Sequence, residues 1–146
     1  MAEKLLSLEP NPNRQNRHPP AALPEYTVIP DMRTVCVKFG KRVTEREIAW
    51  YARSLRMDPA FNPEFSEIVD LREVEELELR GEEMMELAEK IDPFSHDAKR
   101  AFVVRDSVQK HAAHMHQILR LAKENLSIFY SIEDAEQWIR LKGLKP

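Results

Sequence analysis

The chain has 146 residues with a formal net charge of −3, and 42% of the residues are hydrophobic. This size and composition fit one globular domain with a single core. No apolar run approaches the roughly 20 residues that span a bilayer, and the N-terminus lacks the apolar segment of a signal peptide. We therefore expect a cytoplasmic protein without an integral membrane segment.

Negative charge is concentrated in one part of the chain. Residues 64–92 contain 12 Asp and Glu against 3 Lys and Arg, a local net charge of −9, which leaves +6 for the rest. Such an acidic stretch is typical of a solvated helix face, and it repels polyanions. We expect no nucleic acid among the partners of this protein.

The first 24 residues differ in composition from the rest of the chain. Residues 9–24 contain five Pro and three Asn without an apolar period, a composition typical of an extended or disordered arm. Residues 25–146 are expected to form one α/β domain. This domain opens with two β-rich runs, Tyr26–Ile29 and Thr34–Phe39, whose short connection predicts a hairpin.

The helix that follows has clear local signals for its start and its end. Thr44 and Glu47 have the spacing of a capping box, and Pro59 predicts an end near Met57. Between them an apolar stripe recurs at helical spacing, at Ile48, Tyr51, Ala52 and Leu55.

The remainder of the chain alternates strand and helix patterns. Apolar runs of strand length lie at Phe65–Leu71, Ala101–Val104 and Leu126–Tyr130. Helical patterns end before Pro93, begin at Asp106 or Ser107, and begin again after Ser131 to end at Gly143. The predicted order ββαβαβαβα implies a mixed, mostly parallel sheet with an N-terminal antiparallel hairpin and right-handed crossovers.

This order and the stretch Ile68–Ala88 (IVDLREVEELELRGEEMMELA) resemble the STAS domain, the fold of bacterial anti-sigma factor antagonists and of the cytoplasmic tails of sulphate transporters. In that family a strand ending in Asp-Leu leads through a Val to Asp-Ser-Ser-Gly, which opens the next helix. Here Asp70, Leu71 and Val74 match the first part, and residues 78–81 stand in place of Asp-Ser-Ser-Gly. The resemblance covers roughly residues 25–141 and implies a STAS-like fold.

The chain departs from that family at the phosphoacceptor. The first Ser of the family motif carries the regulatory phosphate, and Leu79 stands in its place. Because leucine has no hydroxyl, the resemblance does not carry the phosphorylation switch to this chain. A closer likeness is to an uncharacterised bacterial group of STAS-like proteins, through the signatures DLR-x-V, E-L and P-F-S at Asp70–Val74, Glu76–Leu77 and Pro93–Ser95.

One candidate ligand site lies at the carboxyl ends of the predicted parallel strands, where open α/β sheets usually bind ligands. The residues that this edge is expected to gather for binding are Arg72, Arg105, Ser107 and Tyr130. Backbone N–H groups at the helix start, together with the arginines, would suit a carboxylate or phosphate. The alternative is that Asp106 and Ser107 only cap the helix and that the arginines are surface charges.

We expect neither a metal nor a cofactor. The histidines His111, His114 and His116 diverge around their predicted helix, and zinc needs three or four converging ligands. The chain has only 3 Gly, which rules out a P-loop and a Rossmann fingerprint. An enzymatic function would rest only on the grouping of His96 with the two arginines and the serine of the candidate ligand site, so we expect no catalytic residues.

A candidate partner surface surrounds Trp50. This residue lies about 200° around the helix from Ile48, on the side that carries Arg46. An outward Trp beside Arg is typical of a protein interface, although stacking on an arginine or packing under the N-terminal arm would also explain it. We add Leu79 and Arg80, at the altered motif, to the predicted partner surface.

The sequence thus leads to two functional hypotheses. The first is a non-enzymatic STAS-like binding or regulatory module that acts through a protein partner without a phosphoacceptor serine. The second is a carrier of a small apolar ligand such as a lipid or acyl chain, enclosed by helices and by the aromatic side chains of Phe61, Phe65 and Phe94. Edge strands and an exposed aromatic helix also predict weak self-association as a homodimer.

Overall fold

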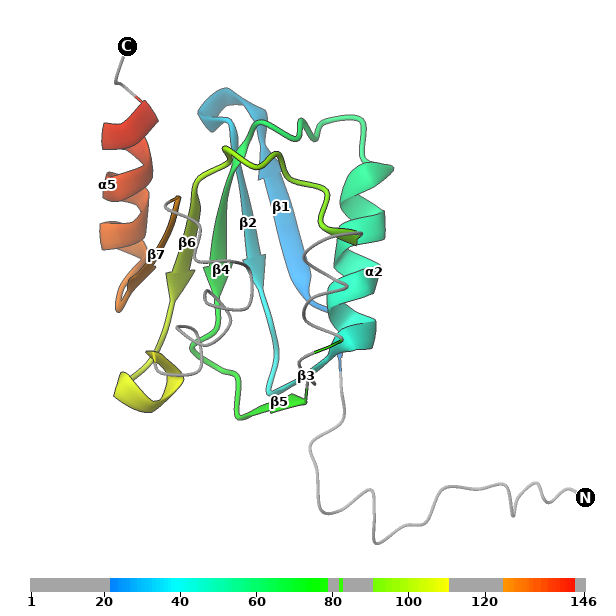
Figure 1. Ribbon diagram of the computed structural model, residues 1–146, viewed down its shortest axis with the longest axis vertical. Coiled ribbons are helices and arrows are strands. Elements are labelled where there is room, and N and C mark those ends of the chain that lie inside the picture. Colours follow the sequence, from blue (N-terminus) through cyan, green and yellow to red (C-terminus); the bar gives the residue numbers. More distant parts are fainter. Residues whose placement is uncertain (1–21, 79–81, 83–90, 111–124, 144–146) are drawn as a thin grey trace, which may run out of the picture.

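A five-stranded sheet forms the centre of the molecule, with helices on both of its faces (Figure 1). The computed structural model describes residues 22–78, 82, 91–110 and 125–143. The strands follow the order β1-β2-β4-β6-β7, and only the β1–β2 pair is antiparallel. Their bounds are Glu25–Ile29 (β1), Thr34–Lys38 (β2), Ser66–Asp70 (β4), Arg100–Val103 (β6) and Leu126–Phe129 (β7). The predicted mixed sheet with an N-terminal hairpin is confirmed.

The hairpin closes through a short 3-10 turn, η1 (Pro30–Met32). Arg33 follows it in the left-handed region, with φ 51°, and its N–H donates to the Pro30 carbonyl at 3.0 Å. This turn sets the register of the two strands, in which Thr27 lies opposite Cys36. The hairpin predicted from the two β-rich runs is therefore present.

Helix α2 (Glu45–Arg56) begins where its capping signals predicted. The Glu47 carboxylate accepts from the Thr44 N–H at 2.7 Å, and the Thr44 hydroxyl accepts from the Arg46 N–H at 3.2 Å. The inner face buries Tyr51, Ala52 and Leu55 against the sheet. Local sequence alone thus determined this helix and the side that it buries.

The two faces of the sheet carry separate cores because successive side chains of a strand alternate between them. On the α2 face, Val35, Val37, Val69 and Phe102 belong to one apolar cluster. The opposite face is covered by α5 (Ile132–Gly143), whose Ala135 and Ile139 form a second cluster with Ile68, Ala101 and Val103 of the sheet. No helix in the described part of the chain is long and apolar enough to cross a membrane.

A second, smaller sheet pairs β3 (Arg42–Thr44) with β5 (Glu76–Glu78) in parallel, with Val43 opposite Leu77. Neither of these strands is predicted from the sequence. Strands of three residues are too short to show an alternating pattern. The pairing depends instead on the Lys41 carbonyl, which accepts from the N–H groups of Glu75 at 2.7 Å and Glu76 at 2.9 Å.

Two predicted helices lie mostly outside the described residues. The first was expected near Gly81 to Pro93, and only its flanks are described. The second begins at Ser107, and Asp106 is its cap because its carboxylate accepts from the Gln109 N–H at 3.0 Å. The cap predicted for the last helix is also present, since the Ser131 hydroxyl accepts from the Asp134 N–H at 3.1 Å.

Candidate functional site

The structure brings the predicted ligand-site residues to one edge of the sheet. Arg72, Arg105 and Tyr130 follow the carboxyl ends of β4, β6 and β7, and Ser107 begins the helix after β6. The ammonium group of Lys110 lies 5.6 Å from the centre of the Tyr130 ring. The predicted juxtaposition is correct in position, but the charges there already have partners.

Arg72 is engaged by the strand that precedes it. Its guanidinium donates to both carboxylate oxygens of Asp70 at 2.9 Å, and its backbone N–H donates to the same carboxylate at 3.0 Å. Burial raises the pKa of Asp70, but these hydrogen bonds outweigh burial and the pKa lies below its usual value. Arg72 therefore neutralises a buried carboxylate, which leaves it less charge for an external anion.

Arg105 is engaged by the loop that follows β4. Its Nη1 donates to the Arg72 carbonyl at 2.6 Å and to the Val74 carbonyl at 3.3 Å, while its Nε donates to Asp106 at 3.1 Å. Gln109 acts on the same loop, as its Nε2 donates to the carbonyls of Leu71 at 2.8 Å and Val74 at 2.7 Å. This role of Gln109 is not predicted from the sequence, because its hydrogen bonds to a loop more than 30 residues away leave no local pattern.

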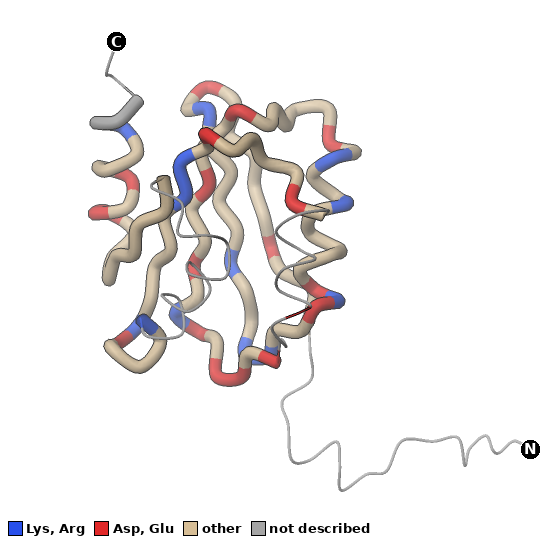
Figure 2. Tube along the Cα trace, in the orientation of Figure 1, with Lys and Arg blue, Asp and Glu red and all other residues tan. Residues whose placement is uncertain are grey.

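Acidic residues line the segment that carries β5, and basic residues of β2 and β3 lie beside it (Figure 2). Arg42 and Glu78 form a bidentate ion pair across the small sheet, at 3.0 and 2.9 Å. Lys38 and Glu73 form a second, exposed pair at 2.9 Å. Between the two glutamates of β5, the Leu77 side chain is 44% exposed. The Arg42–Glu78 pair links β3 to β5, and Leu77 leaves an apolar side chain at the surface.

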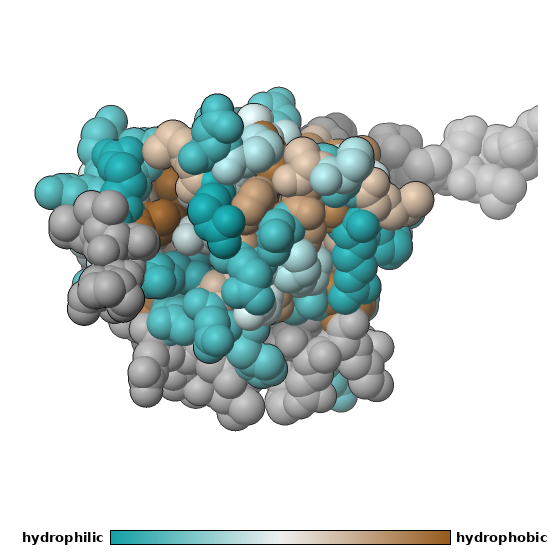
Figure 3. All heavy atoms as spheres, turned by 90° about the horizontal axis from the view of Figure 1, so that it is seen from above, coloured by the Kyte–Doolittle hydropathy of each residue, from teal (hydrophilic) through white to brown (hydrophobic). Residues whose placement is uncertain are grey.

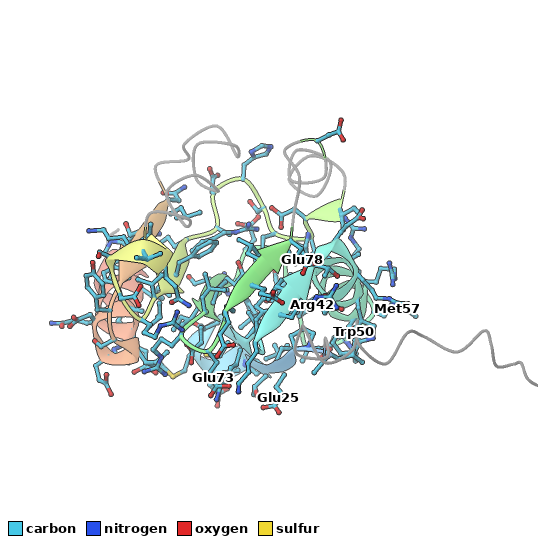
Figure 4. All side chains as sticks on the ribbon, turned by 90° about the horizontal axis from the view of Figure 1, so that it is seen from below. Glu25, Arg42, Trp50, Met57, Glu73 and Glu78 are labelled. Carbon is cyan, nitrogen blue, oxygen red and sulfur yellow. The ribbon has the colours of Figure 1, made fainter. Side chains whose placement is uncertain are left out.

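Two of the predicted partner residues, Arg46 and Trp50, lie on α2 on the side near β5. Seen from the carboxyl ends of the parallel strands, Glu78, Arg42 and Trp50 follow one another across the surface (Figure 4). Arg46, one turn before Trp50 on α2, is exposed. Leu79 and Arg80 lie outside the described residues, and they follow directly on Glu78 in the sequence. α2 and β5 therefore share one surface.

Trp50 is less outward than the helical wheel predicted. Its side chain is half-buried and packs against the apolar cluster of the α2 face. The ring meets Tyr26 of β1 edge-on, with centroids 6.3 Å apart. A large ring near the flank of a helix can reach past its own backbone to the sheet edge, and this explains the difference.

A buried charged network, absent from the sequence analysis, joins α2 to the sheet. The Tyr51 hydroxyl donates to Glu67 at 2.8 Å, and the Arg100 guanidinium lies 3.6 Å from the same carboxylate. Arg100 also donates to Asp92 at 2.6 Å and lies 4.5 Å above the centre of the Phe94 ring. Glu67 and Arg100 are register partners on β4 and β6, so the network depends on a strand pairing that no local pattern reveals.

The network controls the protonation of its members. Burial, followed by the negative charge of Glu67, raises the pKa of Tyr51 well above its ordinary value. Burial lowers the pKa of Arg100, but the carboxylates of Glu67 and Asp92 outweigh burial and raise it. Tyr51 therefore stays a hydrogen-bond donor, and Arg100 stays charged.

The aromatic side chains proposed to line a ligand pocket pack on one another. Phe61 meets Phe65 at 6.3 Å and Phe94 at 5.1 Å between ring centroids, both edge-to-face. Phe65 and Phe94 are buried. This cluster lies at the amino-terminal ends of the parallel strands, the end seen in Figure 3, where apolar residues show between polar ones. These rings form core contacts with each other.

His96 lies at the opposite end of the sheet from the arginines that would accompany it in an enzyme. It precedes β6, in a segment whose Ser95 N–H donates to the Pro63 carbonyl at 2.8 Å. The grouping of His96 with Arg72 and Arg105 is therefore wrong. The predicted histidine helix lies outside the described residues, and within them no group of three His, Cys, Asp or Glu could hold a metal ion.

Comparisons with known proteins identify the fold. No protein-family model matches the chain, and no curated protein does so either. Among solved structures, an uncharacterized protein of the DUF3478 family from Shewanella loihica PV-4, with a SpoIIAA-like fold, superimposes with a TM-score of 0.57 at 17% sequence identity. The match covers 80% of this chain and 91% of that chain. The chain therefore has a STAS-like fold, as the resemblance implied.

Proposed function

We propose that this protein is a non-enzymatic, STAS-like regulatory module that binds a protein partner in the cytoplasm. The partner docks on the exposed side chains of Arg46, Leu77 and Glu78 and on the partly exposed side chains of Arg42 and Trp50, which together we call the α2–β5 surface. One observation carries the proposal: β3 runs directly into α2 and pairs with β5. This places the residues just before the altered family motif beside the exposed side of α2.

The chemistry of the α2–β5 surface suits a protein more than a small ion. Two of its charges are paired within the chain, because Arg42 binds Glu78 through two hydrogen bonds. Its apolar parts are the exposed side chain of Leu77 and the half-buried ring of Trp50, which packs edge-on against Tyr26. A rigid aromatic group surrounded by Arg and satisfied polar groups is typical of an interface centre and its rim.

Binding at this surface is proposed to be independent of phosphorylation at the family position. Leu79 follows the Arg42–Glu78 pair in the sequence and has no hydroxyl. A partner would therefore meet an apolar residue where an anti-sigma factor antagonist presents serine or phosphoserine. Residues 76–82 contain no Ser, Thr or Tyr, so this segment offers no hydroxyl group for a kinase to phosphorylate.

Substitution of Leu77 tests the surface. A photo-crosslinking residue at position 77, introduced in the source cells, identifies the partner, which is then purified and titrated. We expect Leu77→Arg to weaken binding at least tenfold, or about 1.4 kcal/mol, because a charge replaces an apolar contact at the interface centre. Val108→Arg is the matched control, since Val108 is 78% exposed and lies in the first turn of the helix after β6, at the edge of the main sheet.

Two results would contradict the proposal. One is equal affinity of the partner for Leu77→Arg and for the wild-type protein. The other is native mass spectrometry that finds the purified protein saturated with a lipid or acyl chain, because this would favour the apolar-ligand carrier.

A further inference from the structure

The loop between β4 and β5 is held by side chains that follow β6 at the same edge of the sheet. Three carbonyls of this loop, those of Leu71, Arg72 and Val74, accept hydrogen bonds from Arg105 and Gln109. The Val74 carbonyl accepts from both. These donors follow β6, more than 30 residues along the chain from the loop. Side chains at the start of the helix after β6 therefore fix the loop between β4 and β5, which is distant from them in the sequence.

The two donors are themselves held in place. The Gln109 side-chain oxygen accepts from the Arg105 backbone N–H at 2.7 Å, which directs its Nε2 to the loop. Asp106 accepts from the Arg105 Nε at 3.1 Å and from the Gln109 N–H at 3.0 Å. Asp106, the cap of this helix, thus also orients the side chains of Arg105 and Gln109.

The held loop leads directly into β5. Val74 is buried and its N–H donates back to the Leu71 carbonyl at 3.0 Å, which closes a turn. The next two N–H groups donate to the Lys41 carbonyl, and β5 then pairs with β3. β5 therefore pairs along its length with β3, and the loop that leads into it is fixed by the side chains after β6.

We propose that Arg105 and Gln109 form a clamp that sets the position of β5, so that the helix start after β6 controls the α2–β5 surface. With the clamp closed, β5 is held against β3, the strand that runs into α2. When the clamp opens, the carbonyls of Leu71, Arg72 and Val74 lose their guanidinium or amide donors, and the turn at Val74 loses the side chains that hold it. β5 has only three residues, and its pairing with β3 is too short to hold it alone. The role of the surface rests on the proposed function, whereas the clamp itself does not.

Hydrogen exchange of the full chain tests the clamp. Gln109→Glu keeps an acceptor for the Arg105 N–H but loses the donor to the loop carbonyls. We expect amides of residues 74–78 to exchange about tenfold faster in this variant, since each net hydrogen bond is worth roughly a factor of ten or less. Arg105→Ala, at an exposed position, is expected to act in the same direction. Val108→Ala, in the same helical turn and directed to solvent, is the matched control and should exchange like the wild type.

The readouts separate the clamp from the docking surface. Wild-type exchange rates at residues 74–78 in both Gln109→Glu and Arg105→Ala would overturn the clamp, whatever the partner does. Faster exchange together with weaker partner binding supports both proposals. Faster exchange with unchanged partner binding supports the clamp and overturns the α2–β5 surface as the docking site.

Discussion

Replacing Arg100 with alanine is expected to lower the free energy of unfolding by about 3–5 kcal/mol, the usual cost of breaking a buried ion pair from one side. Arg100 is 5% exposed and Glu67 is also 5% exposed. Without the guanidinium, the Glu67 carboxylate keeps only the Tyr51 hydroxyl among the partners described above, and Asp92 loses its donor at 2.6 Å. Urea denaturation followed by circular dichroism measures the loss.

A double-mutant cycle identifies the cause of that loss. Glu67→Gln retains an acceptor for Tyr51 while it removes the charge, so Glu67→Gln combined with Arg100→Ala leaves no buried glutamate charge to compensate. The double variant should lose less than the sum of the single variants, with a coupling of roughly 0.5–3 kcal/mol. Arg53→Ala, on the exposed side of α2, should change stability by no more than about 0.5 kcal/mol. Equal losses for Arg53→Ala and Arg100→Ala would contradict this role for the network.

Replacing Leu55 with alanine is expected to cost about 2–5 kcal/mol of unfolding free energy. Leu55 is fully buried, with 0% exposure, on the inner face of α2 and belongs to the apolar cluster between α2 and the sheet. The cost combines the lost burial of the side chain with the cavity that remains. Since α2 carries Arg46 and Trp50 of the α2–β5 surface, the same variant should also bind the partner less well.

The exposed end of the same helix provides the control. Met57 is 83% exposed, so Met57→Ala should change stability by no more than about 0.5 kcal/mol. Leu55→Met, which nearly conserves volume, should cost less than about 1.5 kcal/mol. A Leu55→Ala variant as stable as Met57→Ala in urea denaturation would show that α2 does not depend on this contact.

The elements that the sequence predicted correctly are those whose signals are local. The start of α2 follows from Thr44 and Glu47, three residues apart, and its buried side follows from a stripe within one helix. The hairpin follows from two adjacent runs and the short turn between them. In each case the stabilising partners lie within a few residues of one another, so that spacing alone identifies them.

The features that the sequence did not predict depend on pairs far apart in the chain. β3 and β5 stabilise each other across more than 30 residues, and each is too short to show a pattern by itself. No local pattern distinguishes Arg100, because its partner Glu67 is known only once β4 and β6 are paired. Arg72 and Arg105 were correctly placed at one edge, but their partners inside the chain could not be seen from position alone.

The central claim is that a protein partner docks on the α2–β5 surface, and hydroxyl-radical footprinting of the wild-type protein with its crosslinked and purified partner tests it most directly. Oxidation of Trp50 and Leu77 is predicted to fall when the partner binds, while oxidation of Val108 and Tyr130, exposed at the other side of the sheet edge, stays unchanged. Protection of Val108 and Tyr130 with no change at Trp50 and Leu77 would contradict the claim and move the docking site to the helix starts after β6 and β7.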